Sequence, residues 1–320
     1  MFLPILIALA PPFLIILLCY ALKRRHVLHT AHVPIMNALV TKIALPALVI
    51  HGLLLAPSIP ADRAVLPFAF LLMEVAILAL AYGVGCIARF PRPMLGAMLL
   101  ICVFGNTGFI GYPLTLALFK PQFPAAILLD QFGMSTPMYL CAAAIGAHFG
   151  ARNQEAGAGR GTAMLRFLRS PIFLSAIIGL LLRMIPIPHA LVGIPILRLS
   201  GQILLQCLGY LGQGTIPLVL LALGVALRPG AARANPGPLL IACALKLIAC
   251  PVMMWGLCHL FGIRGDLRSV SVLEAAMPTS VVASILAGQN DLEGDFAVGV
   301  VFCSTVLSAL TIPLLLSLLR

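Results

Sequence analysis

Charged side chains are scarce in this 320-residue chain, at 9% of the sequence, and only nine residues are acidic. A hydrophobic share of 62% and a mean hydropathy of +1.12 accompany that scarcity. A water-soluble domain of this size could not cover its surface with so few polar side chains. Apolar runs of about 20 residues recur along the chain, each long enough for one helix to cross a bilayer. Because these runs are continuous rather than alternating, the sequence predicts an all-α integral membrane protein and not a barrel.

Motifs for catalysis or cofactor binding are also missing. There is no Gly-x-Ser-x-Gly, no Walker loop and no His-Glu-x-x-His. The nine cysteines form no Cys-x-x-Cys pair, and His26, His29 and His32 have no Cys or carboxylate ligand nearby. The basic residues fall in short connections rather than along one face, which argues against a nucleic-acid partner. We therefore expect no enzyme activity, no catalytic residue, no metal site and no cofactor.

Cutting the chain at its charged and Pro/Gly-rich connections gives ten candidate membrane spans. They are 2–22, 33–55, 64–88, 94–119, 122–149, 168–187, 203–227, 237–261, 267–288 and 295–319. When alternate connections are assigned to alternate sides, one side receives eleven basic residues and the other seven. Because basic residues favour the cytoplasmic side, both termini are predicted to lie outside.

The longest connection, 150–167, is basic and rich in Gly and Ala, and we expect it to be a cytoplasmic linker. It separates a first half, 1–149, from a second half, 168–320, each with five spans. An odd number of spans makes the second half enter the membrane from the opposite side, as in an inverted repeat. The second span (LPALVIHGLLLAP) and the seventh (IPLVLLALGVALRP) show a similar pattern at the same place in each half. We interpret residues 1–320 as one transmembrane domain built from two inverted repeats.

The fourth span contains FGNTGFIGYP (104–113), with three glycines, a proline and two polar side chains in an otherwise apolar run. The corresponding ninth span contains EAAMPTS (274–280). Proline and glycine interrupt helices, and an unwound membrane helix exposes backbone groups that can bind a ligand. Either stretch alone is also compatible with a kinked helix whose polar side chains bond to neighbouring helices. The matching pair favours a binding site.

Candidate site residues come from these two stretches and from ionisable side chains within spans. For substrate binding we predict Asn106, Thr107, Gly108, Tyr112, Pro113, Met277, Pro278, Thr279 and Ser280. For ion or proton coupling we predict Asp130 with its neighbour Gln131, Glu74 and Glu274, because acids inside a membrane are functional candidates. Lys42 and Lys246 are candidates for a counter-charge to an anionic substrate, although lysines in spans more often extend to the interface.

The three acids each leave an alternative open. Asp130 is also compatible with a helix end near the interface, and Glu274 with a side chain that points outward. Glu74 is in mid-span, where it could carry a proton or pair with one of the two lysines.

The sequence resembles the auxin efflux carrier family, which includes plant PIN carriers and bacterial malate or malonate permeases. The residues that carry the resemblance are FGNTGFIGYPL at 104–114, IPLVLLALGVAL at 216–227, LKLIACP at 245–251, EAAMPTSVVASILA at 274–287 and FCSTVLSALTIPLLLSLL at 302–319. The resemblance implies ten helices in two inverted repeats, with the fourth and ninth crossing at their prolines, Pro113 and Pro278, and with Asn106 at the first crossing. It implies a fold shared in outline with bile-acid symporters and sodium/proton antiporters. The short central connection resembles the compact bacterial branch rather than the PIN carriers.

These expectations combine into a secondary transporter that moves small organic anions such as dicarboxylates by alternating access, with proton coupling considered. The alternatives are a sodium-coupled symporter of the bile-acid type and, in another class, a membrane sensor or enzyme without transport. The expected partners are the organic anion, H⁺ or Na⁺ and the lipid bilayer, and a homodimer is one option for the assembly. The expected location is the bacterial inner membrane.

Overall fold

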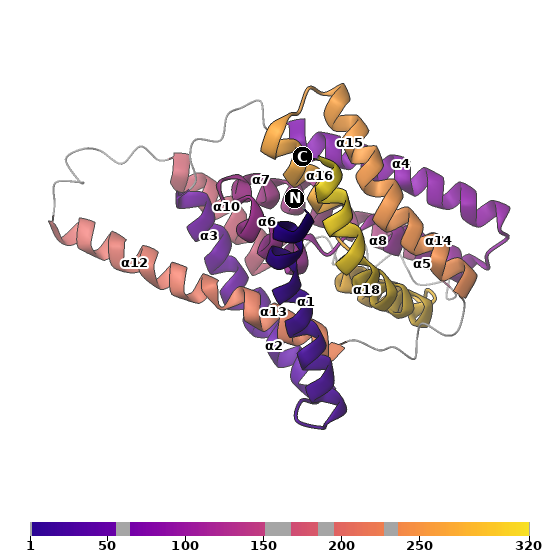
Figure 1. The fold of residues 1–320 in the computed structure, drawn as a ribbon, viewed down its shortest axis with the longest axis horizontal. Coiled ribbons are helices and arrows are strands. Elements are labelled where there is room, and N and C mark those ends of the chain that lie inside the picture. The colour runs from indigo at the N-terminus through magenta and orange to yellow at the C-terminus, as the bar shows by residue number, and fades with distance from the viewer. Residues whose placement is uncertain (1, 56–64, 151–167, 185–194, 227–235, 320) are drawn as a thin grey trace. The chain divides into compact units, whose positions relative to one another are not determined.

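The computed structural model describes residues 2–55, 65–150, 168–184, 195–226 and 236–319, and within them it is helical (Figure 1). No described residue belongs to a strand, apart from one isolated β-bridge between Gly105 and Thr279. The helices are α1 (Phe2–Arg24), α2 (Val33–Leu39), α3 (Leu45–Leu55), α4 (Val65–Ile87), α5 (Arg92–Val103), α6 (Tyr112–Leu118), α7 (Phe123–Leu128), α8 (Thr136–Phe149), α10 (Pro171–Met184), α12 (Pro195–Gln213), α13 (Thr215–Ala226), α14 (Pro236–Ala244), α15 (Cys250–Leu260), α16 (Gly265–Ala275), α17 (Val281–Gln289) and α18 (Gly294–Leu319).

Five helical stretches of the described chain are long and apolar enough to cross a membrane. They are Thr30–Leu55, Val65–Ile87, Leu199–Ala226, Pro236–Leu260 and Gly294–Leu318. The prediction of an all-α membrane protein is therefore confirmed, whereas the count of ten spans and the inverted relation of the halves stay predictions. The predicted seventh span, 203–227, matches the stretch Leu199–Ala226 within a few residues at its start, and α12 itself begins earlier, at Pro195, a residue whose fixed φ suits the first turn of a helix. Residues 151–167 of the predicted linker lie outside the described residues.

The fourth and ninth predicted spans are both interrupted. The fourth consists of α5, a π-helical turn (Thr107–Gly111) and α6, and the ninth consists of α16 and α17. The first half-helices, α5 and α16, have 12 and 11 residues. At 1.5 Å per residue each is about 16 to 18 Å long, roughly half the hydrocarbon thickness of a bilayer.

The position of the first break corrects the sequence-based expectation. The chain is non-helical at Phe104–Asn106, and Pro113 lies seven residues further on, inside the second half-helix. Only the break in the ninth span contains its proline, Pro278. A proline near the start of α6 needs no broken chain, because the turn before it can widen instead.

That widening recurs: each π-helical turn of the described chain ends two residues before a proline. The four turns are η2 (Val40–Ala44), η4 (Thr107–Gly111), η6 (Leu129–Ser135) and η8 (Leu245–Ala249), and the prolines are Pro46, Pro113, Pro137 and Pro251. Proline lacks the N–H that would bond one turn back and crowds the carbonyl there, so the preceding turn opens to a wider helix. Five of the polar candidates predicted from sequence lie on these turns: Lys42, Thr107, Asp130, Gln131 and Lys246.

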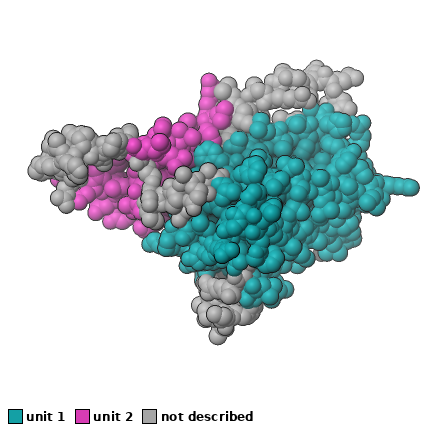
Figure 2. All heavy atoms as spheres, turned by 90° about the horizontal axis from the view of Figure 1, so that it is seen from above, with its two compact units in different colours: residues 1–14, 60–167, 227–320 teal, residues 15–59, 168–226 magenta. Residues whose placement is uncertain are grey.

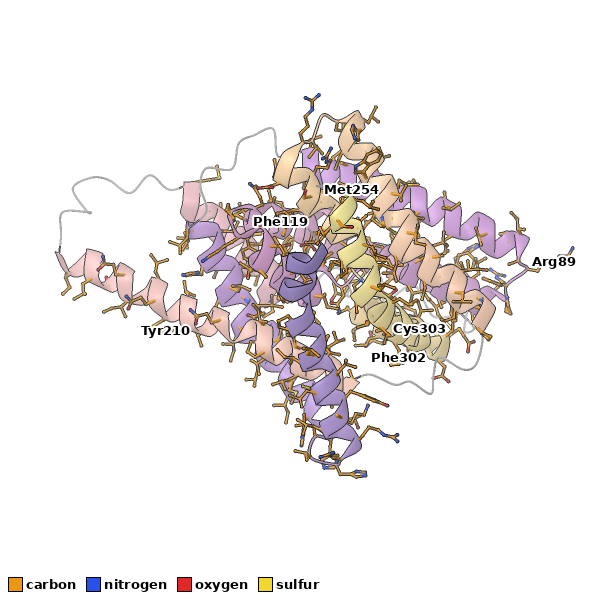
Figure 3. All side chains as sticks on the ribbon, viewed as in Figure 1. Arg89, Phe119, Tyr210, Met254, Phe302 and Cys303 are labelled. Carbon is orange, nitrogen blue, oxygen red and sulfur yellow. The ribbon has the colours of Figure 1, made fainter. Side chains whose placement is uncertain are left out.

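The chain divides into two compact units (Figure 2), and each contains parts of both halves of the sequence. Unit 1 comprises residues 1–14, 60–167 and 227–320, and unit 2 comprises residues 15–59 and 168–226. In unit 2, helix α3 packs closely on α10 and α12 at glycines. A Cβ on Gly179 would lie 2.8 Å from Leu53, and one on Gly212 would lie 3.0 Å from the backbone of Leu48. Tyr210 projects outward from α12 (Figure 3). Both interrupted helices belong to unit 1.

Candidate functional site

The two breaks meet and hydrogen-bond to each other. The amide of Asn106 donates to the carbonyl of Pro278 at 2.7 Å, and the amide of Ser280 donates to the carbonyl of Phe104 at 2.9 Å. These bonds form the antiparallel bridge between Gly105 and Thr279. A broken membrane helix must satisfy its released backbone groups within the protein, and here each break satisfies the other. We call these segments, 104–106 and 278–280, the crossing.

The crossing is tightly packed around Gly105. A Cβ there would lie 3.1 Å from the Nζ of Lys246 and 3.3 Å from the carbonyl oxygen of Met277. On the other side of the bridge, the hydroxyl of Thr279 donates to the carbonyl of Ile101 at 2.9 Å, and its amide donates to the hydroxyl of Ser304 at 3.1 Å. Neighbouring groups thus fix both extended segments.

Lys246 binds the ends of both first half-helices. Its Nζ donates to the carbonyl of Val103, the last residue of α5, at 3.2 Å, and to the carbonyl of Ala275, the last residue of α16, at 3.1 Å. The side chain is 1% exposed, so it does not extend to the interface. A helix C-terminus carries partial negative charge and unpaired carbonyls, and a buried ammonium stabilises both. Lys42 is exposed and lies in unit 2.

The beginnings of the second half-helices are more accessible than the ends of the first. Gly108 and Phe109 at the start of the π turn, and Val281 and Val282 at the start of α17, are half-buried. Asn106 is 5% exposed, and its side-chain Nδ2 has no hydrogen-bond partner among the described residues. Helix N-termini carry partial positive charge and free amides. The crossing therefore presents two positive helix ends beside one unpaired amide donor.

Asp130 is the centre of a buried polar network. One carboxylate oxygen accepts from the hydroxyls of Thr107 and Ser135, and the other accepts from the hydroxyl of Tyr112 at 2.7 Å and from the amide of Gln131. The residue is buried, and it lies within the continuous helical run 123–149 rather than at a helix end. Since Thr107 lies on one π turn and Asp130 on another, the carboxylate joins the two turns. We call these five residues the Asp130 cluster.

The two glutamates are bonded less completely. Glu274 is fully buried rather than pointing outward; one oxygen accepts from Thr115 at 2.8 Å, and the other has no partner in the described chain. It packs against Gly111, where a Cβ would collide with its carboxylate. Glu74 is also buried, and neither of its oxygens has a hydrogen-bond partner among the described residues.

The nine residues predicted to bind substrate differ in whether their polar groups are already bonded within the protein. The hydroxyls of Thr107, Tyr112, Thr279 and Ser280 all bond to the protein itself, and Pro113, Met277 and Pro278 are buried. Asn106 and Gly108 keep polar groups that a ligand could use.

Several site residues were missed. Thr115, Ser135 and Ser304 bond to candidate residues, Phe109 is half-buried within the π turn, and Val281 begins α17. The glycine-rich run FGNTGFIGYP could have indicated the close backbone approach at Gly105. No sequence pattern pairs Thr115 with Glu274, which lies 159 residues away.

Three close His, Cys, Asp or Glu side chains that could hold a metal ion do not occur among the described residues. His26 and His29 are exposed and His32 is half-buried, and their rings contact one another in sequence, with centroids 6.3 and 5.6 Å apart.

Helices that break in pairs and cross at a buried polar site define a class of membrane transporters. Comparison with known proteins agrees: the membrane transport protein family matches residues 4–316, and the chain belongs to this family, the auxin efflux carrier family. An uncharacterized transporter of Methanothermobacter thermautotrophicus is 27% identical over 301 residues, which cover 94% of this chain and 93% of the relative. An uncharacterized transporter of Methanocaldococcus jannaschii is 28% identical over 308 residues, which cover 94% of each.

Proposed function

We propose that this protein is a secondary transporter of small organic anions, such as dicarboxylates, which it moves by alternating access. The observation that supports an anion most directly is the asymmetry of the crossing. The negative ends of the first half-helices are buried and bound by Lys246, whereas the positive ends of the second half-helices are partly accessible. The partial positive charge and free amides at such helix ends compensate a carboxylate for the loss of its hydration shell.

Asn106 and Gly108 hold the substrate carboxylate in this proposal. The unpaired Nδ2 of Asn106 supplies a side-chain donor, and Gly108, the second residue of the π turn, has no side chain that would keep a ligand from its backbone. The remaining hydroxyls near the crossing act indirectly, because they bond to the protein.

Coupling to protons is supported by the unpaired carboxylate oxygens. Glu74 has two and Glu274 has one, so either side chain can exchange a proton without first breaking every bond to its neighbours. Sodium coupling is the alternative. Carbonyls at half-helix C-termini would suit a sodium ion, but Lys246 already binds the last carbonyl of each, which favours protons.

Alternating access, in this proposal, comes from an elevator-like movement of the helices that carry the crossing. A bacterial inner-membrane location with both termini outside, and assembly as a homodimer, belong to the same proposal.

The test is uptake of C3 and C4 dicarboxylates by proteoliposomes that contain the full chain. An inward proton gradient should drive uptake and a sodium gradient alone should not. Asn106→Ala should abolish uptake, while Asn37→Ala, a matched change at a half-buried residue in α2 of unit 2, should not. Size-exclusion profiles show whether both variants fold. Unchanged uptake by a folded Asn106→Ala variant would remove Asn106 from the site, and a strict need for sodium would favour the symporter.

A further inference from the structure

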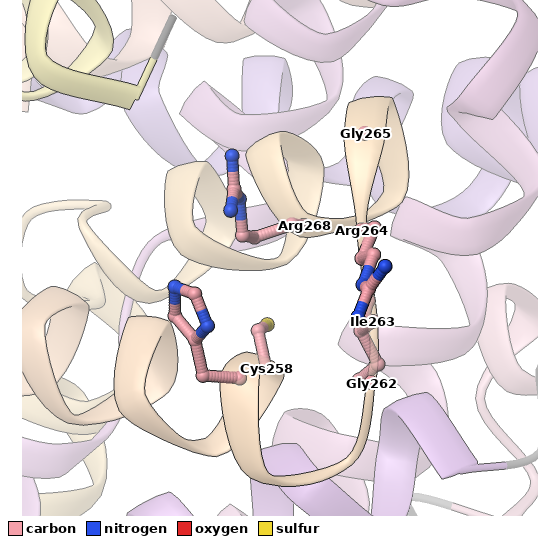
Figure 4. A pocket seen from close by; sticks show the side chains of 7 residues that line it. Cys258, Gly262, Ile263, Arg264, Gly265 and Arg268 are labelled. Carbon is pink, nitrogen blue, oxygen red and sulfur yellow. The ribbon is translucent and has the colours of Figure 1, made fainter.

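A basic cavity lies at the turn between α15 and α16, at the opposite end of α16 from the break in the ninth span. Its volume is about 320 Å³, within the range of small-molecule sites. Cys258, His259, Gly262, Ile263, Arg264, Gly265 and Arg268 line it (Figure 4). Three of these described lining residues carry a guanidinium or an imidazole and none is acidic, so the cavity is suited to an anion.

The local backbone adds to this preference. Arg264 precedes α16 in an extended conformation, and Gly265 has a φ of +60°, a value that glycine adopts without strain. Arg264 gives the start of α16 no side-chain cap. Asp266 in the first turn is exposed and does not line the cavity. The first amides of α16 therefore lie beside two arginines at the same cavity.

An exposed apolar stripe on η8 and α15 leads to the cavity. Ile248, Val252, Trp255 and His259 follow the spacing i, i+4, i+7 and i+11, which places them on one helix face. The first three are 59%, 58% and 43% exposed. Trp255 packs edge-on against His259, with ring centroids 4.5 Å apart. In a membrane protein such a face contacts acyl chains, and tryptophan is enriched at the depth of the lipid head groups.

We propose that this cavity binds the phosphate of an anionic phospholipid, whose acyl chain lies along Ile248, Val252 and Trp255. Arginine guanidinium groups bind phosphate oxygens in pairs, and His259 lies where the apolar stripe meets the charged cavity. Free phosphate would offer the same chemistry to the arginines. It would leave the stripe without a function, which is why the lipid is favoured.

Thermal unfolding of the purified full chain in a neutral detergent tests the proposal. Dioleoyl phosphatidylglycerol should raise the unfolding midpoint at lower concentration than dioleoyl phosphatidylcholine. Since one basic residue near a membrane surface contributes roughly a fivefold change in binding, Arg264→Gln should need about fivefold more phosphatidylglycerol for the same shift. Lys120→Gln removes the same charge from an exposed residue in another connection, and it should respond like the unaltered chain.

Two further arms separate the lipid from a free anion. Trp255→Ala should weaken the response to phosphatidylglycerol, and inorganic phosphate at millimolar concentration should not reproduce that response. Equal responses to the two lipids, or an unaltered response in Arg264→Gln and in a second variant at an exposed position, His259→Gln, would overturn the proposal. Stabilisation by inorganic phosphate that Arg264→Gln abolishes and Trp255→Ala retains would overturn the lipid as the ligand and identify a free-anion site.

Discussion

Two buried carboxyl groups of unit 1 are treated in opposite ways by their surroundings. In the Asp130 cluster, four side chains donate to one carboxylate. At Glu74, no described group donates to either oxygen. A buried polar group without partners is costly and persists in a protein only when something compensates for it. Acids within membrane spans can therefore have different roles, depending on the groups that surround them. Asp130 holds two π turns together, and Glu74 keeps its oxygens available.

The environment of Lys246 differs from those of both acids. It is buried like the acids, but its partners are backbone carbonyls at the ends of α5 and α16. It therefore fixes the crossing directly.

Replacing Lys246 by Met should have the largest effect, because it removes one cation from two half-helix ends. Hydrogen bonds to a charged group contribute about 1.5 to 3 kcal/mol each, and two buried carbonyls would be left unpaired. We expect a marked fall in the unfolding midpoint and loss of uptake. Lys42→Met is the matched control for stability, since Lys42 also lies on a π turn before a proline but is exposed. An equal midpoint in the two variants would contradict the structural role of Lys246.

The next largest effects should come from the two acids. Asp130→Asn should mainly change stability, and Glu74→Gln should mainly change transport. Asp130→Asn replaces an acceptor by an NH₂ group that faces other donors, and we expect a loss of about 1 to 3 kcal/mol in stability. Glu74→Gln breaks no hydrogen bond, so its unfolding midpoint should equal or exceed that of the unaltered chain.

Uptake then distinguishes a coupling role from a structural one. If Glu74 carries the proton, Glu74→Gln should make uptake independent of the imposed proton gradient. Asp130→Asn should lower the amount of folded protein and retain dependence on the gradient in what remains. A destabilised Glu74→Gln variant together with a stable Asp130→Asn variant would invert the comparison and refute it.

The residues explain which features could be predicted from sequence. Apolar runs and their connections predicted the membrane class, and glycine and proline together indicated that the fourth and ninth spans are interrupted. Proline alone misplaced the first break, because a π turn accommodates Pro113 while Gly105 is where the backbones approach. The sequence also contains a regularity that the prediction did not use: each π turn of the described chain ends two residues before a proline.

The bonding of the polar candidates could not be predicted, because it depends on partners far apart in the chain. Lys246 and Val103 are separated by 143 residues, and Glu274 and Thr115 by 159. Composition marks each side chain as unusual in a membrane. Only the packed structure shows that the hydroxyls of Thr107 and Tyr112 are already bonded and that the side-chain Nδ2 of Asn106 has no partner in the described chain.

Tyr112→Phe should have the smallest effect of the series, and it tests how far the Asp130 cluster depends on any one donor. The change removes the hydroxyl that donates to Asp130 at 2.7 Å but keeps the ring that packs on Phe123 with centroids 5.2 Å apart. Gln131 still donates to the same carboxylate oxygen, so no acceptor is left bare. The expected loss is therefore about 1 kcal/mol, with uptake retained. Tyr210→Phe, at an exposed position on α12, should leave the unfolding midpoint unchanged. A loss as large as that of Asp130→Asn would mean that the hydroxyl, and not the shared set of donors, stabilises the carboxylate.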